Sequence, residues 1–151
     1  MELKTLSLQE KDQVAALFLA VFTRPPWNDD WSLPGQLDAY LTDLMGNPNS
    51  LSLGLEEDGR LLGLALGSVK HWHHGTEYCV EEFCIAPDCQ GRGLGSRFLE
   101  EIQRWLAPRG ILHLFLQTER TAPAYEFYRK NGFTELTDHV SLAKTIDPPI
   151  H

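Results

Sequence analysis

The sequence predicts a mixed α/β layer, in which one β-sheet carries helices on both faces. Three observations support this fold class. Segments with alternating apolar residues, such as Leu51–Leu55, are interspersed with segments whose apolar residues recur at helical spacing, such as Leu94–Trp105. Glycines and prolines at turn positions separate these segments. The 151 residues suit one compact domain, which we expect to span residues 1–145, with a short tail over residues 146–151.

Composition and charge narrow the classes of function. The net charge of −8 disfavours a nucleic acid partner, which needs a basic surface, and is more compatible with a cationic, amine-bearing substrate. Apolar runs are too short to cross a bilayer, and the first residues lack a signal-peptide pattern. We therefore expect a cytoplasmic protein that binds no membrane. Cys79, Cys84 and Cys89 match no common zinc or disulfide spacing, and we expect reduced thiols.

The chain begins with a predicted strand over Glu2–Leu6, followed by a helix. Ser7 and Glu10 have the spacing of a capping box, which satisfies free N–H groups at a helix start. The apolar stripe of this first helix consists of Val14, Leu17, Phe18, Val21 and Phe22. Pro25 and Pro26 end it, and a second helix is predicted from about Leu33 to Met45.

The loop between these helices contains two tryptophans that flank two carboxylates, Trp27, Asp29, Asp30 and Trp31. One interpretation is structural: the indoles cover the core, while an aspartate or Ser32 caps the second helix. The other interpretation is that at least one of these residues contacts a substrate.

Two strands are predicted next, over Leu51–Leu55 and Leu61–Val69, joined by a hairpin turn at Asp58-Gly59. The following turn carries His71, His73 and His74. Cysteine or carboxylate partners at zinc spacing are not apparent near them. We therefore interpret them as polar hairpin residues and expect no metal.

A strand over Glu77–Ala86 runs into a glycine-rich turn and then into a helix over Gly93–Leu106. The first turn of a helix has unpaired N–H groups at the positive end of its dipole, and glycines let a ligand approach closely. Arg92 and Arg97 add positive charge in an otherwise acidic chain. The pattern indicates a phosphate site. The glycines match neither the P-loop nor the dinucleotide-binding spacing.

The remaining elements alternate in the same way. A buried strand is predicted over Ile111–Leu116, then a helix over about Ala122–Lys130 that Thr121 can cap. Two final strands are predicted over Phe133–Leu136 and Val140–Lys144.

Two segments carry a resemblance to a known family. Gln90-x-x-Gly93-x-Gly95, after the strand that ends in Ile85-Ala86-Pro87, resembles the acetyl-CoA signature of the GCN5-related N-acetyltransferases. The segment Ala124–Phe133, with its FY-x-x-x-GF pattern, is similar to the family's second signature. The resemblance covers nearly the whole chain. It implies a mostly antiparallel sheet of six or seven strands, whose fourth and fifth strands splay apart to admit the pantetheine arm of acetyl-CoA.

The resemblance also implies which residues bind the cofactor. Strand backbone at Phe83, Cys84 and Ile85 would face pantetheine, and the turn would wrap the pyrophosphate with Gln90, Gly91, Arg92, Gly93, Leu94, Gly95 and Ser96. Thr121 stands where some members have an asparagine that touches pantetheine, and a threonine hydroxyl can also form hydrogen bonds.

Acyl transfer to an amine makes three chemical demands. A lysine-like amine is only about one part in a few thousand neutral at pH 7, so a base is needed, and Glu81 and Glu82 are the available carboxylates. As neighbours on a strand they point to opposite faces, so we expect at most one to reach the cleft. Backbone N–H groups around Cys84 and Ile85 would stabilise the oxyanion. By the resemblance, Tyr128 would protonate the leaving thiolate.

The predicted function is acetyl-CoA-dependent N-acetylation of a primary amine on a small molecule or peptide, by direct attack on the thioester. In the family the loop of Trp27, Asp29, Asp30 and Trp31 lines the acceptor side, and we expect it to bind substrate. The sequence also looks similar to aminoglycoside 6′-acetyltransferase-like branches. The alternatives are a protein N-terminal or lysine acetyltransferase, and a non-catalytic acyl-CoA-binding module. A homodimer is a further expectation.

Overall fold

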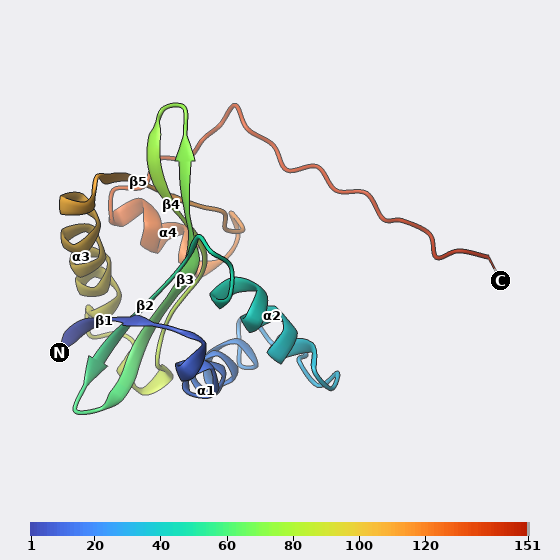
Figure 1. Cartoon of the computed structure of the whole chain (residues 1–151), viewed down its shortest axis with the longest axis horizontal. Helices are drawn as coiled ribbons and strands as arrows, with labels where there is room; N and C mark the ends of the chain where they lie inside the picture. The colour runs from blue at the N-terminus through green and yellow to red at the C-terminus, as the bar shows by residue number, and fades with distance from the viewer. Residues whose placement is uncertain (151) are drawn as a thin grey trace.

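The computed structural model describes residues 1–150 and has one five-stranded sheet (Figure 1). The strands lie in sequence order across the sheet, and they are β1 (Glu2–Leu6), β2 (Ser50–Glu57), β3 (Arg60–Trp72), β4 (Gly75–Ile85) and β5 (Ile111–Leu116). The first four pair antiparallel, and β5 pairs parallel to β4. The predicted mixed, mostly antiparallel sheet is confirmed.

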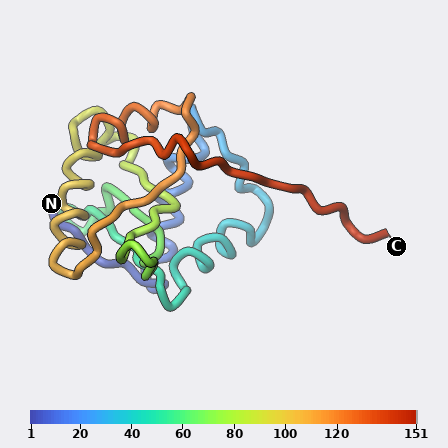
Figure 2. The backbone as a smooth tube through the Cα atoms, turned by 90° about the horizontal axis from the view of Figure 1, so that it is seen from above, coloured from blue at the N-terminus to red at the C-terminus, as the bar shows by residue number. Residues whose placement is uncertain are grey.

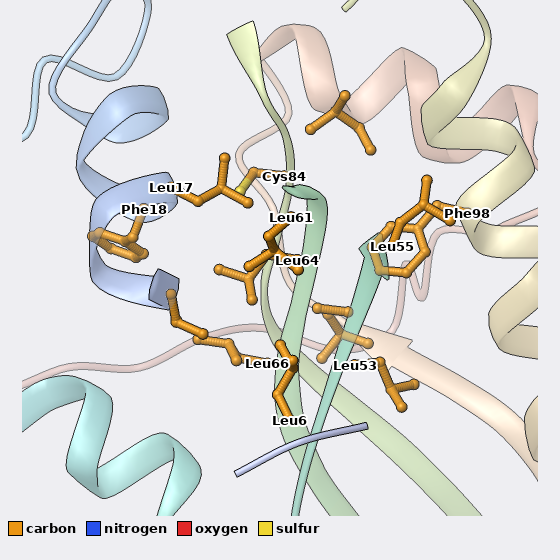
Figure 3. Close-up of a cluster of buried hydrophobic side chains, with 14 of the residues drawn as sticks. Leu6, Leu17, Phe18, Leu53, Leu55, Leu61, Leu64, Leu66, Cys84 and Phe98 are labelled. Carbon is orange, nitrogen blue, oxygen red and sulfur yellow. The ribbon is translucent and has the colours of Figure 1, made fainter. Parts of the chain in front are cut away.

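Helices cover both faces of the sheet, as predicted. They are α1 (Lys11–Phe22), α2 (Gln36–Met45), α3 (Leu94–Leu106) and α4 (Pro123–Lys130). Figure 3 shows Phe18 of α1 and Phe98 of α3 on opposite sides of the sheet, each in contact with a layer of leucines. No helix in the described part of the chain is long and apolar enough to cross a membrane.

Local signals in the sequence explain where several elements begin. The capping box is confirmed: Ser7 Oγ accepts from the backbone N–H of Gln9 at 3.2 Å, and the Ser7 N–H donates to Glu10 at 2.7 Å. It heads a short 3-10 turn that leads into α1. The predicted cap at Thr121 is wrong. Pro123 occupies the first turn of α4, which makes Ala122 the capping residue, and it has no side-chain hydrogen bond to offer.

The predicted number of strands is also wrong. The segments Phe133–Leu136 and Val140–Lys144 have no strand structure, so the sheet has five strands rather than six or seven. A strand forms only where a neighbouring strand completes its hydrogen bonds, and no strand of the sheet pairs with either of these segments. Phe133 and Glu135 remain in contact with α4, through Tyr128 and Tyr125, whereas Figures 1 and 2 both show the last part of the chain as an extended arm that leaves the body of the molecule.

Candidate functional site

The fourth strand separates from the fifth part of the way along its length. Pairing of β4 with β5 runs from Thr76 opposite Ile111 to Val80 opposite Leu116, and β5 ends there. Among the described residues, the stretch 82–85 of β4 is therefore paired only with β3. The resemblance implied fourth and fifth strands that splay apart; in the structure β4 continues beyond the end of β5 and its edge is open there.

The register decides which backbone groups of β4 face the open edge. The Ala86 N–H donates to the Leu62 carbonyl oxygen of β3 at 2.8 Å. Because alternate residues of an antiparallel strand point to alternate sides, the N–H groups of Phe83 and Ile85 face the open edge. The Ile85 carbonyl oxygen accepts from Gln90 Nε2 at 3.0 Å, which agrees with this direction.

The same register bears on the predicted oxyanion donors. The Ile85 N–H faces the opening as expected, whereas the Cys84 N–H points toward Leu64 of β3. The N–H group that faces the open edge together with that of Ile85 is therefore that of Phe83 and not that of Cys84. The direction of an N–H depends on the pairing register, which the sequence alone does not give.

A β-bulge sets the two neighbouring glutamates apart. Leu66 of β3 pairs with Glu82 and the next residue, Gly67, pairs with Val80, so Glu81 is an extra residue on β4. Glu81 is exposed, while Glu82 is half-buried on the side of the sheet that α2 covers. Of the two predicted candidates for the base, Glu82 is the one enclosed by the protein.

Glu82 is held by a tyrosine from the second helix. The Tyr40 hydroxyl donates to Glu82 Oε1 at 2.6 Å. Burial raises the pKa of Glu82, the bond from Tyr40 opposes that rise, and the nearby charges of Asp29 and Glu81 add to it. A carboxyl whose pKa is raised in this way is a stronger proton acceptor than an exposed one.

The tryptophan–aspartate loop divides between the site and the core. Trp31 stacks on Tyr40, with ring centroids 5.2 Å apart, and its indole N–H is buried without a hydrogen-bond partner among the described residues. Asp29 is exposed and close enough for its charge to act on Glu82. Trp27 instead packs on Phe22 of the core, with ring centroids 5.8 Å apart.

Neither aspartate of the loop caps the second helix. Asp30 Oδ1 accepts from the Ser32 N–H at 2.9 Å in a local turn. The helix starts later than predicted, at Gln36, with Gly35 in a left-handed conformation as its capping residue. This arrangement leaves two acceptor-side candidates in the loop: Asp29, whose charge acts on Glu82, and Trp31, which stacks on Tyr40.

Tyr128 lies on α4 at the open edge of β4. Its ring contacts the rings of Phe83, Phe127 and Phe133, with centroids 6.2, 5.3 and 5.3 Å away. Burial raises the pKa of Tyr128 to about 12, and the charged forms of Cys84 and Glu82 add to the rise. The hydroxyl therefore stays protonated at any pH used in an assay.

The glycine turn leads into α3 without a side-chain cap. Gly91 and Gly93 have φ values of +77° and +74°, which glycine adopts without strain, and open space lies where a Cβ would be. Gly93 is the capping residue of α3, so the N–H groups of the first turn, from Leu94 to Ser96, lack a side-chain partner. A Cβ on Gly95 would lie 2.9 Å from the Phe127 ring, so glycine lets α3 and α4 approach closely. These features fit an anionic ligand such as the pyrophosphate of coenzyme A.

Other sequence candidates lie away from this region. His71, His73 and His74 are exposed on the hairpin between β3 and β4, where the rings of the latter two pack against Trp72. The described residues contain no group of three or more side chains that could hold a metal ion. Thr121 is exposed in the loop before α4.

Sequence reasoning missed Tyr40. Its spacing along the chain places it on one helical face with Leu37, Leu41 and Leu44, which predicts a core position rather than a contact with the site. The available signal was a hydroxyl in an otherwise aliphatic stripe, because a buried tyrosine hydroxyl needs a hydrogen-bond partner.

Comparison with known proteins extends these observations. The profile of the acetyltransferase (GNAT) family matches residues 12–133. A mycothiol acetyltransferase of Pseudarthrobacter chlorophenolicus is 30% identical over 131 residues, which are 83% of this chain and 40% of that protein. The ribosomal protein bS18 alanine N-acetyltransferase of Salmonella typhimurium is 29% identical over 113 residues, 74% of this chain and 67% of that protein. The chain spans about 40% of the length of the first curated relatives it matches.

Solved structures share the fold. A crystal structure of an aminoglycoside acetyltransferase from an uncultured soil metagenomic sample, in complex with sisomicin, superposes with a TM-score of 0.74 at 16% identity. The superposition covers 97% of this chain and 96% of that one.

Proposed function

This chain belongs to the acetyltransferase (GNAT) family, and from that premise we propose that it transfers an acetyl group from acetyl-CoA to a primary amine by direct attack on the thioester. One observation carries the proposal. Near the open edge of β4 lie a half-buried carboxylate, Glu82, a half-buried phenol, Tyr128, and an uncapped helix start. These are a base, an acid and an anion site for one reaction.

Acetyl-CoA would bind along the glycine turn and the open edge. The N–H groups at the start of α3 would receive the pyrophosphate, in the turn from Gln90 to Ser96. The outward N–H and carbonyl groups of Phe83 and Ile85 would pair with the pantetheine arm, as a neighbouring strand would. Arg92 donates to the Asp88 carbonyl oxygen at 3.2 Å, which holds it beside the turn.

The chain's own residues then meet the three chemical demands. Glu82 would accept a proton from the acceptor's ammonium, directly or through water, so that the neutral amine can attack the thioester carbon. The outward backbone N–H groups of β4 would stabilise the oxygen that becomes negative. Tyr128 would donate a proton or a hydrogen bond to the sulfur as the carbon–sulfur bond breaks.

The acceptor is proposed to be a cationic amine. Asp29, Glu81 and Glu82 lie close enough for their charges to interact, and the chain as a whole carries a net charge of −8. Trp31 and Tyr40 add an aromatic wall beside the carboxylates, which suits a cation. An amine on an aminoglycoside-like small molecule is the first candidate, and a protein N-terminus or lysine is the second.

Release of coenzyme A thiol tests the proposal. We expect thiol release from acetyl-CoA with one class of amine from a panel of aminoglycosides, polyamines, amino acids and short peptides. Glu82→Gln and Tyr128→Phe should reduce turnover while acetyl-CoA still binds. Binding without thiol release for every amine would refute catalysis with these acceptors and favour a non-catalytic acyl-CoA-binding module. Release with peptides alone would favour the protein acetyltransferase.

Two further proposals concern the oligomeric state of the protein and its location in the cell. We propose a homodimer, because the apolar side chains of the C-terminal arm and one edge of β5 are open to solvent in the described single chain. We also propose a cytoplasmic location, because Cys79, Cys84 and Cys89 are free, and reduced thiols are typical of that compartment.

A further inference from the structure

The pairing of Tyr40 with Glu82 joins two distant parts of the chain. Tyr40 is on α2 and Glu82 follows the bulge of β4, so the hydrogen bond spans 42 residues of sequence. At 2.6 Å between Tyr40 Oη and Glu82 Oε1, the bond is short, as expected for a hydroxyl that donates to a charged carboxylate. Both side chains are half-buried, so competition from water is reduced.

The tyrosine ring is itself fixed in place. Trp31 stacks on it with an interplanar angle of 22°, and Phe18 meets it edge-on with centroids 6.1 Å apart. A ring held on two sides has few orientations open to it, so its hydroxyl has a defined position. The hydroxyl also remains a donor at any ordinary pH, because burial and the neighbouring Glu82 raise the pKa of Tyr40 well above its usual range.

We propose that Tyr40 is a positioning residue for the reaction: its hydroxyl holds Oε1 of Glu82, so that Oε2 is the oxygen presented to the acceptor amine. This inference rests on the proposed function, in which Glu82 is the base. It assigns the acceptor a defined approach, from the side of β4 where Trp31 and Asp29 lie.

The groups around Glu82 make the role of Tyr40 testable by titration. Asp29 of the loop and Glu81 of the same strand are acidic and raise the pKa of Glu82, as burial does. On the other side, Cys84 and Tyr128 are neutral, because burial raises the pKa of both. The bond from Tyr40 is the one contribution that lowers the pKa of Glu82. Removal of the Tyr40 hydroxyl should therefore raise it.

Tyr40→Phe is the variant to make, with Tyr125→Phe as its matched control. Phenylalanine keeps the ring stack on Trp31 and loses only the hydroxyl. Tyr125 Oη donates to Glu135 Oε2 at 3.1 Å, so the control removes a tyrosine–glutamate bond of the same kind outside the site. A third protein, with 3-fluorotyrosine at position 40, keeps the bond and makes the donor more acidic.

The first readout needs no activity. In protein labelled with ¹³C at the glutamate carboxyl, the Glu82 signal is identified by its loss in Glu82→Gln and followed against pH. We expect its midpoint to rise in Tyr40→Phe, to fall with 3-fluorotyrosine and to stay unchanged in Tyr125→Phe. An unchanged midpoint in Tyr40→Phe would overturn the inference, whether or not an acceptor has been found.

The second readout is kinetic. In Tyr40→Phe we expect kcat/KM near pH 6 to fall roughly tenfold or more, as for a lost hydrogen bond to a charged group, and the acid limb of the pH profile to move upward. Part of the loss should recover at higher pH. A uniform loss at every pH, with the carboxyl midpoint shifted, would mean that Tyr40 binds Glu82 without serving the reaction, and would also overturn the positioning role.

Discussion

Glu82 is a carboxylate that the fold keeps half-buried although burial disfavours its charge. Because the pKa of Glu82 is raised in the folded protein, the protonated form is favoured by folding. Its contribution to stability is therefore fully present below the unfolded pKa and is lost as the pH rises through the folded pKa. A residue that weakens the fold at neutral pH and lies at the open edge of a strand is more readily explained by chemistry than by packing.

Replacing this carboxylate should separate stability from activity. Glu82→Gln should raise the melting temperature at pH 7.5, by about 1–3 °C, because the amide has no charge to bury and still accepts from Tyr40. The gain should shrink at pH 4.5, because a larger share of the wild-type carboxyl is protonated there. Thermal unfolding of both proteins at the two pH values measures this difference in melting temperature. A variant less stable than wild type at pH 7.5 would contradict the account of the pKa.

Loss of the Tyr128 hydroxyl should affect turnover rather than stability. Tyr128→Phe should lower kcat roughly 100-fold or more, the usual range for loss of a general acid, with little change in the affinity for acetyl-CoA. The ring contacts with Phe83 and Phe133 are kept, so the fold should tolerate the change. Isothermal titration with coenzyme A and steady-state kinetics give the two numbers. A parallel loss of affinity would assign Tyr128 to binding instead.

The bulge of β4 positions Glu82, and a glycine in the neighbouring strand permits the bulge. Gly67 of β3 lies against the backbone of Cys79 and Val80, and a Cβ there would overlap the Cys79 carbonyl oxygen. Backbone cannot move aside as a side chain can. The bulge of β4 and Gly67 opposite it thus act together to place Glu82 on the side of the sheet that faces α2.

Gly67→Ala should therefore destabilise the protein by about 1–3 kcal/mol or more and reduce activity, because the strands must separate to admit the methyl group. Gly54→Ala in β2 is the control: its Cβ would meet only side-chain ends, those of Leu61 at 2.5 Å and Leu6 at 3.1 Å, which can shift more easily than backbone. Urea unfolding compares the two. Equal losses would mean that the bulge is not the sensitive feature.

The local elements were predictable from the sequence, and the contacts between them were not. Alternating leucines and a capping box identified β2 and the start of α1, because those signals involve near neighbours in the chain. The choice between Glu81 and Glu82 depended on a bulge, and the partner of Glu82 lay on a distant helix. No spacing along the chain encodes either fact.

The C-terminal arm is a second feature that could not be predicted from the sequence, because its pairing depends on the rest of the molecule. Its sequence predicted a strand over Val140–Lys144, and among the described residues no strand pairs with that segment. Val140 and Leu142 are 80% and 92% exposed, and Leu112 on the outer edge strand β5 is 70% exposed. Gln117 Nε2 donates to Ser141 Oγ at 3.2 Å, so the arm passes the end of β5 as it leaves the body. The unpaired backbone groups of such a segment can form hydrogen bonds with the open edge of a strand such as β5.

We expect the arm of one copy to pair with β5 of a second copy, which would restore the predicted strand between two chains. Light scattering after size-exclusion chromatography should then give twice the 17.1 kDa of one chain. Leu142→Pro removes an N–H from the middle of the segment and should shift the protein to monomer, whereas Asp147→Pro, beyond the predicted strand, should leave the dimer intact. A monomeric wild type with slow amide exchange over residues 140–144 would instead mean that the arm folds back on its own β5, and that the strand, but not the dimer, was predicted correctly.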